Sequence, residues 1–372
     1  MKVLVSGAGV AGLSSAYWFD RAGAEVTVVE LHDGLRQGGA PIDIRGDALG
    51  TAARMGILDR ARALAIPASA SVAPVLDGTG AQQATIDLTW FANESTEDFE
   101  ITRDHLNALL RASLGERVEF LFGTCVESLD DRPDGVRAGL SDGTYREFDL
   151  VVGADGLHSN TRRLAFGGED RYVRHRGAYV ALVDLDPAAD WDHAMFSVPG
   201  LMVSVRPVED RMMAYLMVCS EQIRYDYRDL DAQRRIVGGF LAGLDVWEIP
   251  RVRAAFLDPA SPGFYLDSVS QTFMDSWTTG RVAVVGDAAH CAALLSGMGT
   301  SLAMTAAEYL AEEVVASPGD LPAAYARFEA RQRPLVDRAQ VFMEEGRRIM
   351  VPATPEELES RNRMLREFAA GG

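Results

Sequence analysis

An aspartate followed by a glycine turn marks one segment of the chain as a candidate for binding chemistry. Residues 282–285 are apolar and typical of a buried parallel strand, Gly286 permits a turn, and Asp287 then lies at the carboxyl end of that strand. Ligands bind at this end in open α/β sheets, where a carboxylate can accept hydrogen bonds from sugar hydroxyls. The backbone N–H groups of a second turn can face an anion or an electron-rich ring edge. The residues of that turn predicted to contact a ligand are Gly297, Met298, Gly299 and Thr300.

The amino terminus has the pattern of a nucleotide-binding turn. Residues 3–5 predict a strand, three glycines follow in GxGxxG spacing, and residues 13–22 predict a helix. The first glycine permits the tight turn, the second lets a pyrophosphate approach the backbone, and the third allows helix and strand to pack closely. A second predicted strand, residues 25–29, ends in an acid that can receive ribose hydroxyls. The residues predicted to contact the nucleotide are Gly7, Gly9, Val10, Ala11, Gly12 and Glu30.

A third motif, GADGLHSNTRR, begins at Gly153 after a strand predicted at residues 149–152. Its aspartate, Asp155, either contacts a nucleotide or bonds nearby backbone in a structural turn. The motifs GxGxxG, GADGLHSNTRR and GDAAH, in this order, resemble those of the class A FAD-dependent monooxygenases of the p-hydroxybenzoate hydroxylase type. The resemblance covers almost the whole chain. Within it, residues 38–45 (GGAPIDIR) and 101–106 (ITRDHL) look most like the tetracycline-modifying flavin hydroxylases.

The resemblance implies roles for five side chains. Glu30 is expected to bind the adenosine ribose of FAD, Arg103 to reach its phosphate and ribityl region, and Asp287 to hold the ribityl chain. Similarity to the tetracycline-type enzymes further implies that Asp43 lies near the flavin and that Arg36 contacts the reducing nicotinamide nucleotide. The alternatives are a turn or cap residue for Asp43 and a solvated surface arginine for Arg36.

The family's chemistry implies that NADPH or NADH reduces FAD and that dioxygen then forms a flavin C4a-hydroperoxide. This species transfers one oxygen atom to an electron-rich aromatic or polyketide-like small molecule. No catalytic side chain is assigned, because the cofactor carries the difficult chemistry while the protein orients the substrate and excludes water. The partners expected are therefore FAD, the nicotinamide nucleotide, dioxygen and the aromatic substrate.

The fold implied is α/β: a Rossmann-like FAD-binding domain of the GR2/PHBH type with an inserted, mostly antiparallel substrate-binding sheet and C-terminal helices. We expect the FAD-binding domain in two parts, residues 1–168 and 273–330. A short insertion of the substrate domain is expected near residues 65–100. The substrate domain itself is expected at residues 169–272, and the C-terminal helices at residues 331–372.

The middle region contains short apolar runs that are typical of an antiparallel sheet. The side chains of Met213, Tyr215 and Met217 share one face by the two-residue period, so they either line a pocket for a flat apolar molecule or pack against helices. After the flavin turn, residues 301–316 and 321–347 predict helices, with Ser301 capping the first and Pro334 kinking or ending the second.

Composition narrows the functional classes. A formal net charge of -18 argues against nucleic acid or an anionic membrane as a partner. No apolar run approaches the length of a membrane span, and three widely spaced cysteines argue against a disulfide framework or a metal site. We therefore expect a cytoplasmic protein that is a monomer or a weak homodimer. Lys2 is the only lysine, which argues against the related flavin-dependent halogenases, since their mechanism is thought to need an active-site lysine.

The chain departs from the family pattern after GDAAH. Many members have proline there and asparagine after the second turn glycine, whereas this chain has Cys291 and Ala292 in the first region and Thr300 and Ser301 in the second. Two alternatives to a monooxygenase therefore stay open. One is an FAD-dependent dehydrogenase or reductase on the same fold, and the other is a non-catalytic protein that binds FAD or another ligand.

Overall fold

The computed structural model describes residues 1–35, 38, 40–88, 95 and 97–371. Arg36, the predicted nicotinamide nucleotide contact, lies outside the described residues. The amino terminus folds as the glycine pattern predicted, into strand β1 (Lys2–Ser6), helix α1 (Val10–Arg21) and strand β2 (Glu25–Glu30). Apolar residues of β1 and β2 are fully buried, which fits strands covered on both faces.

These strands belong to a six-stranded sheet in the order β17-β18-β11-β1-β2-β7. Neighbouring strands are parallel, except that the short edge strand β17 runs antiparallel to β18. The carboxyl ends of β1, β11 and β18 therefore meet at one edge, and each leads into one of the three sequence motifs. The additional strands are β7 (Glu119–Phe122), β11 (Leu150–Gly153), β17 (Thr278–Thr279) and β18 (Val282–Val284).

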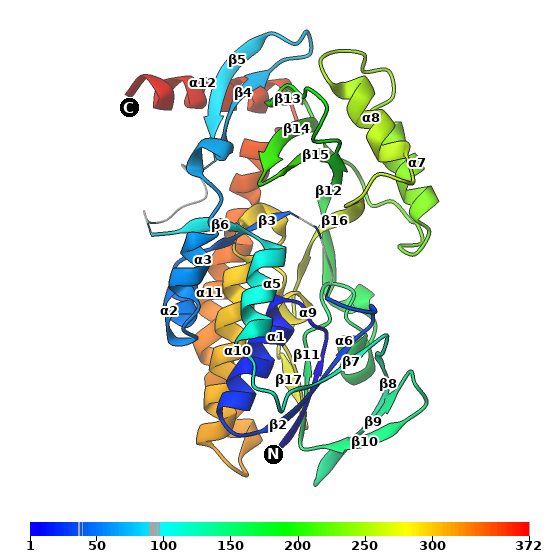
Figure 1. Ribbon diagram of the computed structural model, residues 1–372, viewed down its shortest axis with the longest axis vertical. Coiled ribbons are helices and arrows are strands. Elements are labelled where there is room, and N and C mark those ends of the chain that lie inside the picture. The colour runs from blue at the N-terminus through cyan, green and yellow to red at the C-terminus, as the bar shows by residue number, and fades with distance from the viewer. Residues whose placement is uncertain (36–37, 39, 89–94, 96, 372) are drawn as a thin grey trace.

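Helices pack against this sheet and share one core with it. Figure 1 shows α1 beside α5 (Arg103–Ala112) and α10 (Gly299–Ala316), and α10 in turn packs against α11 (Leu321–Met350). Leu13 of α1, Leu310 of α10 and Phe328 of α11 are all fully buried in that core. The close packing fixes the amino-terminal ends of α1 and α10 relative to the sheet edge.

A second sheet has seven strands in the order β16-β12-β15-β14-β13-β4-β5. Its neighbouring strands are antiparallel except for β13 and β4, which run parallel. Strands β4 and β5 come from the first hundred residues, and the other five follow the GADG motif. The strands are β4 (Val72–Leu76), β5 (Gln82–Asp87), β12 (Val173–Leu185), β13 (Ala194–Val198), β14 (Leu201–Val208), β15 (Arg211–Cys219) and β16 (Tyr265–Thr272).

The two faces of the seven-stranded sheet have different neighbours. One face packs against α7 (Leu230–Phe240) and α8 (Ile249–Leu257). The opposite face carries Met213, Tyr215 and Met217, which share it as the two-residue period predicted. That face packs against residues of α11 and of the final helix, α12 (Pro355–Gly371).

Smaller elements connect the two sheets. Strand β3 (Pro41–Ile44) pairs antiparallel with β6 (Phe99–Thr102), which places Asp43 opposite Glu100. Strands β8 to β10 form a separate three-stranded sheet. The remaining elements are α2 (Asp47–Arg54), α3 (Leu58–Ala63), β8 (Val126–Arg132), β9 (Gly135–Leu140), β10 (Tyr145–Phe148), α6 (Asn160–Ala165), α9 (Asp287–His290) and the 3-10 turns Ala68–Ser71, Glu169–Arg171 and Leu294–Ser296.

Two local predictions near the carboxyl terminus need correction: the cap expected at Ser301, and the helix boundary that was one of the two alternatives for Pro334. Helix α10 begins at Gly299, so Ser301 lies inside it and does not cap it; the Ser301 hydroxyl instead accepts a hydrogen bond from the backbone N–H of Arg45 at 2.9 Å. Pro334 lies within α11 and does not end it. Helix α11 is consequently continuous across residue 330. No helix among the described residues is long and apolar enough to cross a membrane.

Candidate functional site

The glycine turn after β1 leaves open space at its second glycine. A Cβ on Gly7, whose φ is +101°, would lie 2.5 Å from the carbonyl oxygen of Ala154, and a Cβ on Gly12 would overlap the carbonyl of Gly7. Nothing lies within 4 Å of the position that a Cβ on Gly9 would take. The first and third glycines are therefore required by packing, while the second leaves room in front of the amino-terminal end of α1, where N–H groups favour an anion.

Glu30 is held against this turn at the end of β2. Its carboxylate accepts hydrogen bonds from the backbone N–H of Ala8 at 2.8 Å and from that of His32 at 3.0 Å. The side chain is 14% exposed, so a carboxylate oxygen can still reach a bound molecule. Val10 and Ala11 follow in the first turn of α1, and both are partly exposed.

Asp155 bonds to residues of its own loop. It accepts hydrogen bonds from the backbone N–H of Thr161 at 2.8 Å, from the Thr161 hydroxyl at 2.9 Å, and from the hydroxyl of Ser159. Ser159 in turn caps α6 through the N–H of Arg162. Of the two readings that the sequence left open for Asp155, these contacts favour the structural turn.

Arg162 has a role that the sequence reasoning did not assign. Its guanidinium is fully buried and donates to the carbonyl of Ala288 at 2.9 Å and to the carbonyl of Leu157 at 2.7 Å. Desolvation lowers the pKa of this side chain, so the two carbonyls and nearby Glu169 must offset the cost of burying a charge. Arg162 thereby joins the GADG loop to the GDAAH loop.

Asp287 begins α9 at the carboxyl end of β18, and the residue is exposed. The protein atoms packed around the carboxyl raise its pKa by partial desolvation even though water still reaches the residue, while the charge of Arg103 acts in the opposite direction. The structure thus brings Arg103, the first residue of α5, close enough to Asp287 to interact with it. A carboxylate in this position can accept hydrogen bonds from a ligand.

The second glycine turn lies beside Asp287. The N–H of Gly297 donates to the carbonyl of Leu294 at 3.0 Å, and the N–H of Met298 donates to the hydroxyl of Ser296 at 3.2 Å. Gly299 and Thr300 form the first turn of α10, where N–H groups lack helical partners. A Cβ on Gly299 would lie 4.0 Å from the Asp287 carboxylate. The N–H donors most suited to a ligand are therefore those of Gly299 and Thr300.

Asp43 forms an ion pair with Arg45 in which the Oδ2 to Nη2 distance is 2.6 Å. Desolvation raises the pKa of Asp43 to about 6, and the charge of Glu100 adds to the effect, whereas Arg45 opposes it. The Arg45 guanidinium also lies against Gly297, where a Cβ would come within 2.7 Å of it. Arg45, which the sequence reasoning did not select, therefore connects β3 with the second glycine turn, residues 297–300.

Tyr215 projects from β15 toward the same group of charges. Arg206 of β14 forms an ion pair with Glu100 at 2.7 Å, and both interact electrostatically with the Tyr215 hydroxyl, as does Arg103. Desolvation raises the pKa of Tyr215, so the hydroxyl stays protonated near neutral pH. The three predicted substrate contacts therefore differ: Tyr215 faces charged groups, whereas Met213 and Met217 are buried among apolar side chains.

His158 ties the GADG loop to the second sheet. Its Nδ1 lies 3.0 Å from Glu169, and its Nε2 lies 3.5 Å from Asp267 of β16. Hydrogen bonds to Asp267 and Glu169 raise the pKa of His158 to about 10. The imidazolium is therefore charged at neutral pH and links the two sheets.

A family model described as "FAD binding domain" matches residues 1–317. The chain belongs to the class A FAD-dependent monooxygenase family. A "Flavin-dependent monooxygenase" of Legionella longbeachae is 30% identical over 346 residues, which are 92% of this chain and 87% of that protein. An uncharacterized protein of Mycobacterium tuberculosis is 38% identical over 365 residues, or 96% of each chain. The crystal structure of tetracycline destructase Tet(51) aligns with a TM-score of 0.85 at 30% identity, covering 99% of this chain and 96% of that one.

The residues of this flavin monooxygenase fit FAD. The open space at Gly9 matches a turn that a pyrophosphate approaches closely, and Glu30 lies at the strand end from which a ribose is bound. Asp287 and Gly299 lie together at the other end of the same sheet edge. Among the described residues, no group of three or more His, Cys, Asp or Glu side chains is arranged to hold a metal ion.

Proposed function

We propose that this flavin monooxygenase uses a reduced nicotinamide nucleotide and dioxygen to hydroxylate an aromatic or polyketide-like small molecule. The observation that supports the proposal is that Arg103 interacts electrostatically both with Asp287 and with Tyr215 of the seven-stranded sheet. Two of these residues belong to the FAD-binding half, and the third belongs to the seven-stranded sheet. A reaction between a flavin and a substrate needs this meeting of a cofactor-binding edge with a second, enclosing surface.

The chain's own residues hold the cofactor in this proposal. The first turn of α1 at Gly9, Val10 and Ala11 receives the pyrophosphate, and Glu30 receives the adenosine ribose. Asp287 and Arg103 bind the ribityl region, and the N–H groups of Gly299 and Thr300 bind the edge of the ring. When bound and reduced, FAD supplies the activation of dioxygen. Asp155 supports the site through its loop.

The substrate lies on the sheet side of the cleft. Tyr215 offers a neutral hydroxyl beside the Arg206–Glu100 pair, and the buried Met213 and Met217 next to it provide an adaptable apolar packing layer. A flat ring system with oxygen substituents matches this mixture of apolar and hydrogen-bonding groups. The likeness to a tetracycline destructase supports the same class of substrate.

The nicotinamide nucleotide is proposed to bind transiently. The chain has one GxGxxG fingerprint and no second one, so a separate nicotinamide domain is not expected. Asp43 lies near the flavin in this proposal, and Arg36 remains a candidate contact from the sequence alone.

The test is a combined measurement on the purified protein. A yellow protein whose NADPH and oxygen consumption is stimulated by an aromatic compound or a tetracycline, with a product heavier by one oxygen atom, supports the proposal. A reduced or desaturated product without oxygen insertion would instead identify a dehydrogenase or reductase. A flavoprotein that NADPH fails to reduce with every compound of the panel would indicate a binding protein.

A further inference from the structure

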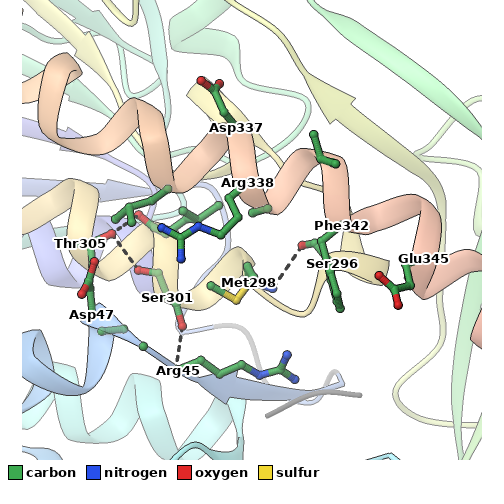
Figure 2. Close-up of a pocket in the computed structure, with 16 residues that line it drawn as sticks. Arg45, Asp47, Ser296, Met298, Ser301, Thr305, Asp337, Arg338, Phe342 and Glu345 are labelled. Atoms are coloured by element: carbon green, nitrogen blue, oxygen red, sulfur yellow. Dashed lines mark hydrogen bonds between the residues drawn. The ribbon is translucent and has the colours of Figure 1, made fainter. Parts of the chain in front are cut away.

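A pocket of about 680 Å³ adjoins the site described above, between α2, the start of α10 and the middle of α11. Figure 2 shows its walls: Arg45 runs along one edge beneath Met298, while Arg338 and Phe342 project from α11. The pocket is partly open to solvent, and its volume is in the range of sites for drug-sized molecules. Nothing in the proposed monooxygenation uses it.

The pocket contains an arginine with an unused donor. Arg45 is 4% exposed, and within the described residues its Nε has no hydrogen-bond partner. The Nη2 group of the same side chain is held by Asp43, which fixes the guanidinium in place. Protein atoms cover this Nε, so the part of Arg45 that favours an acceptor in the pocket is the positive charge of its fixed guanidinium, which lines the space.

Two further features favour an anion at this place. Arg338 is exposed on α11 and has no ion-pair partner in the described part of the chain, and Figure 2 shows its guanidinium extending toward Ser301. Ser301 belongs to the first turn of the 18-residue helix α10, whose N–H groups carry partial positive charge. Arg45, Arg338 and the amino-terminal end of α10 therefore place positive charge around the same pocket from different elements.

Acidic residues at the rim limit the charge of the occupant. Asp47 lines the pocket at the start of α2, and Glu345 lines it from the far end of α11. Figure 2 shows the third acid, Asp337, turned away from the space. These carboxylates disfavour a phosphate with two negative charges and favour a single negative charge near the arginines. Leu302 and Phe342 supply apolar walls for a ring.

We propose that this pocket is a second small-molecule site that binds a flat aromatic carboxylate, with the carboxylate between Arg45 and Arg338 and the ring against Leu302 and Phe342. Binding of this molecule changes the surroundings of the flavin, because Arg45 also pairs with Asp43 and lies against Gly297. Binding at this pocket does not require the proposed monooxygenation, so either proposal can fail without the other.

The test is calorimetric titration of the FAD-loaded protein with 2-naphthoate and with the neutral 2-naphthamide. We expect 2-naphthoate to bind and 2-naphthamide to bind about tenfold or more weakly, because the amide lacks the charge that strengthens hydrogen bonds to arginine. Arg338→Gln should weaken 2-naphthoate binding by a similar factor. Arg348→Gln, on the same helix but outside the pocket, should leave it unchanged, since that side chain is 65% exposed.

A second pair of variants separates this pocket from the substrate cleft. Val341, 79% exposed at the mouth of the pocket, can become tryptophan without disturbing the core, and Val341→Trp should block 2-naphthoate. Val315→Trp, at an exposed position of α10 outside the pocket, is its control.

In addition, 2-naphthoate should perturb the visible spectrum of bound FAD in the wild type and lose this effect in Arg338→Gln. The proposal would be overturned if 2-naphthoate and 2-naphthamide bind equally or if neither binds. It would also be overturned if both pocket variants bind 2-naphthoate as the wild type does, or if binding leaves the spectrum of FAD unchanged.

Discussion

The guanidinium of Arg162 donates a 2.9 Å hydrogen bond to the carbonyl oxygen of Ala288, and this bond joins the second sequence motif to the third. The two loops follow neighbouring parallel strands, β11 and β18, whose regular pairing ends at Gly153 and Val284, before the loops begin. The buried Arg162 side chain therefore helps to position the Asp287 turn relative to the GADG loop, together with the backbone bond from the Val285 N–H to the Gly153 carbonyl.

Arg162→Met should destabilise the protein by about 2–4 kcal/mol, because two buried carbonyls lose their donor. The change is measured by urea unfolding. Arg163→Met is the matched control, since Arg163 is exposed and bonds only to the side chain of neighbouring Asn160 among described residues. Equal stability of the two variants would show that the Arg162 contacts contribute nothing to the fold.

Gly9→Val should lower the ratio of FAD to purified protein by about tenfold or more while the chain still folds. The valine meets open space in the protein but occupies the path of the pyrophosphate. Gly239→Val, at an exposed position of α7 with similar free space, should retain wild-type flavin content. Full flavin occupancy in Gly9→Val would remove this turn from the cofactor site.

Asp287→Ala should raise the dissociation constant for FAD by about tenfold, because a hydrogen-bond acceptor for the ribityl chain is lost. Asp287→Asn keeps one acceptor oxygen and should fall between the alanine variant and the wild type. Fluorescence titration of the FAD-free proteins measures all three constants. Three equal constants would place Asp287 outside the cofactor contacts.

Tyr215→Phe should raise the KM for the aromatic substrate about fivefold, since one hydrogen bond to the substrate is removed. Flavin content and the slow oxidation of NADPH without substrate should not change. Tyr227→Phe, on an exposed tyrosine, serves as the control in the same steady-state assay. A Tyr215→Phe enzyme with unaltered KM would assign that hydroxyl to packing.

His158→Gln should change how stability depends on alkaline pH. The pKa of His158 is raised to about 10 from 6.5, so its ion pairs stabilise the folded chain fully below pH 6.5, and this contribution is lost as pH rises through 10. After allowance for solvent screening of this partly exposed side chain, we expect the wild type to lose about 1 kcal/mol more than the variant between pH 7 and 10.5. Urea unfolding at both pH values measures the difference, and parallel pH profiles would contradict it.

Local patterns predicted much of the FAD-binding half. The apolar runs of β1, β2 and β18 are next to their glycine turns, so a few adjacent residues determine both the strand and the direction of the chain after it. The faces of β15 could also be read, since Met213, Tyr215 and Met217 alternate with residues packed against α7 and α8.

Contacts between distant segments could not be predicted from local sequence patterns. Arg45 acquires its role through Asp43, Gly297 and Ser301, and no local pattern connects these positions. Ser301 looked like a helix cap because serine favours that place, but α10 starts earlier and the hydroxyl is used by Arg45. The pairing of β4 with β13 likewise depends on tertiary packing.

That pairing has a consequence during synthesis on the ribosome. Val75 of β4 lies opposite Met195 of β13, which is made 195 minus 75, or 120, residues later. At about 5–20 residues per second, β4 and β5 wait several seconds for their neighbour while Val75 and Ile86 lack the surface that later buries them. The β4–β5 hairpin therefore stays without its partner strand for that interval in the nascent chain.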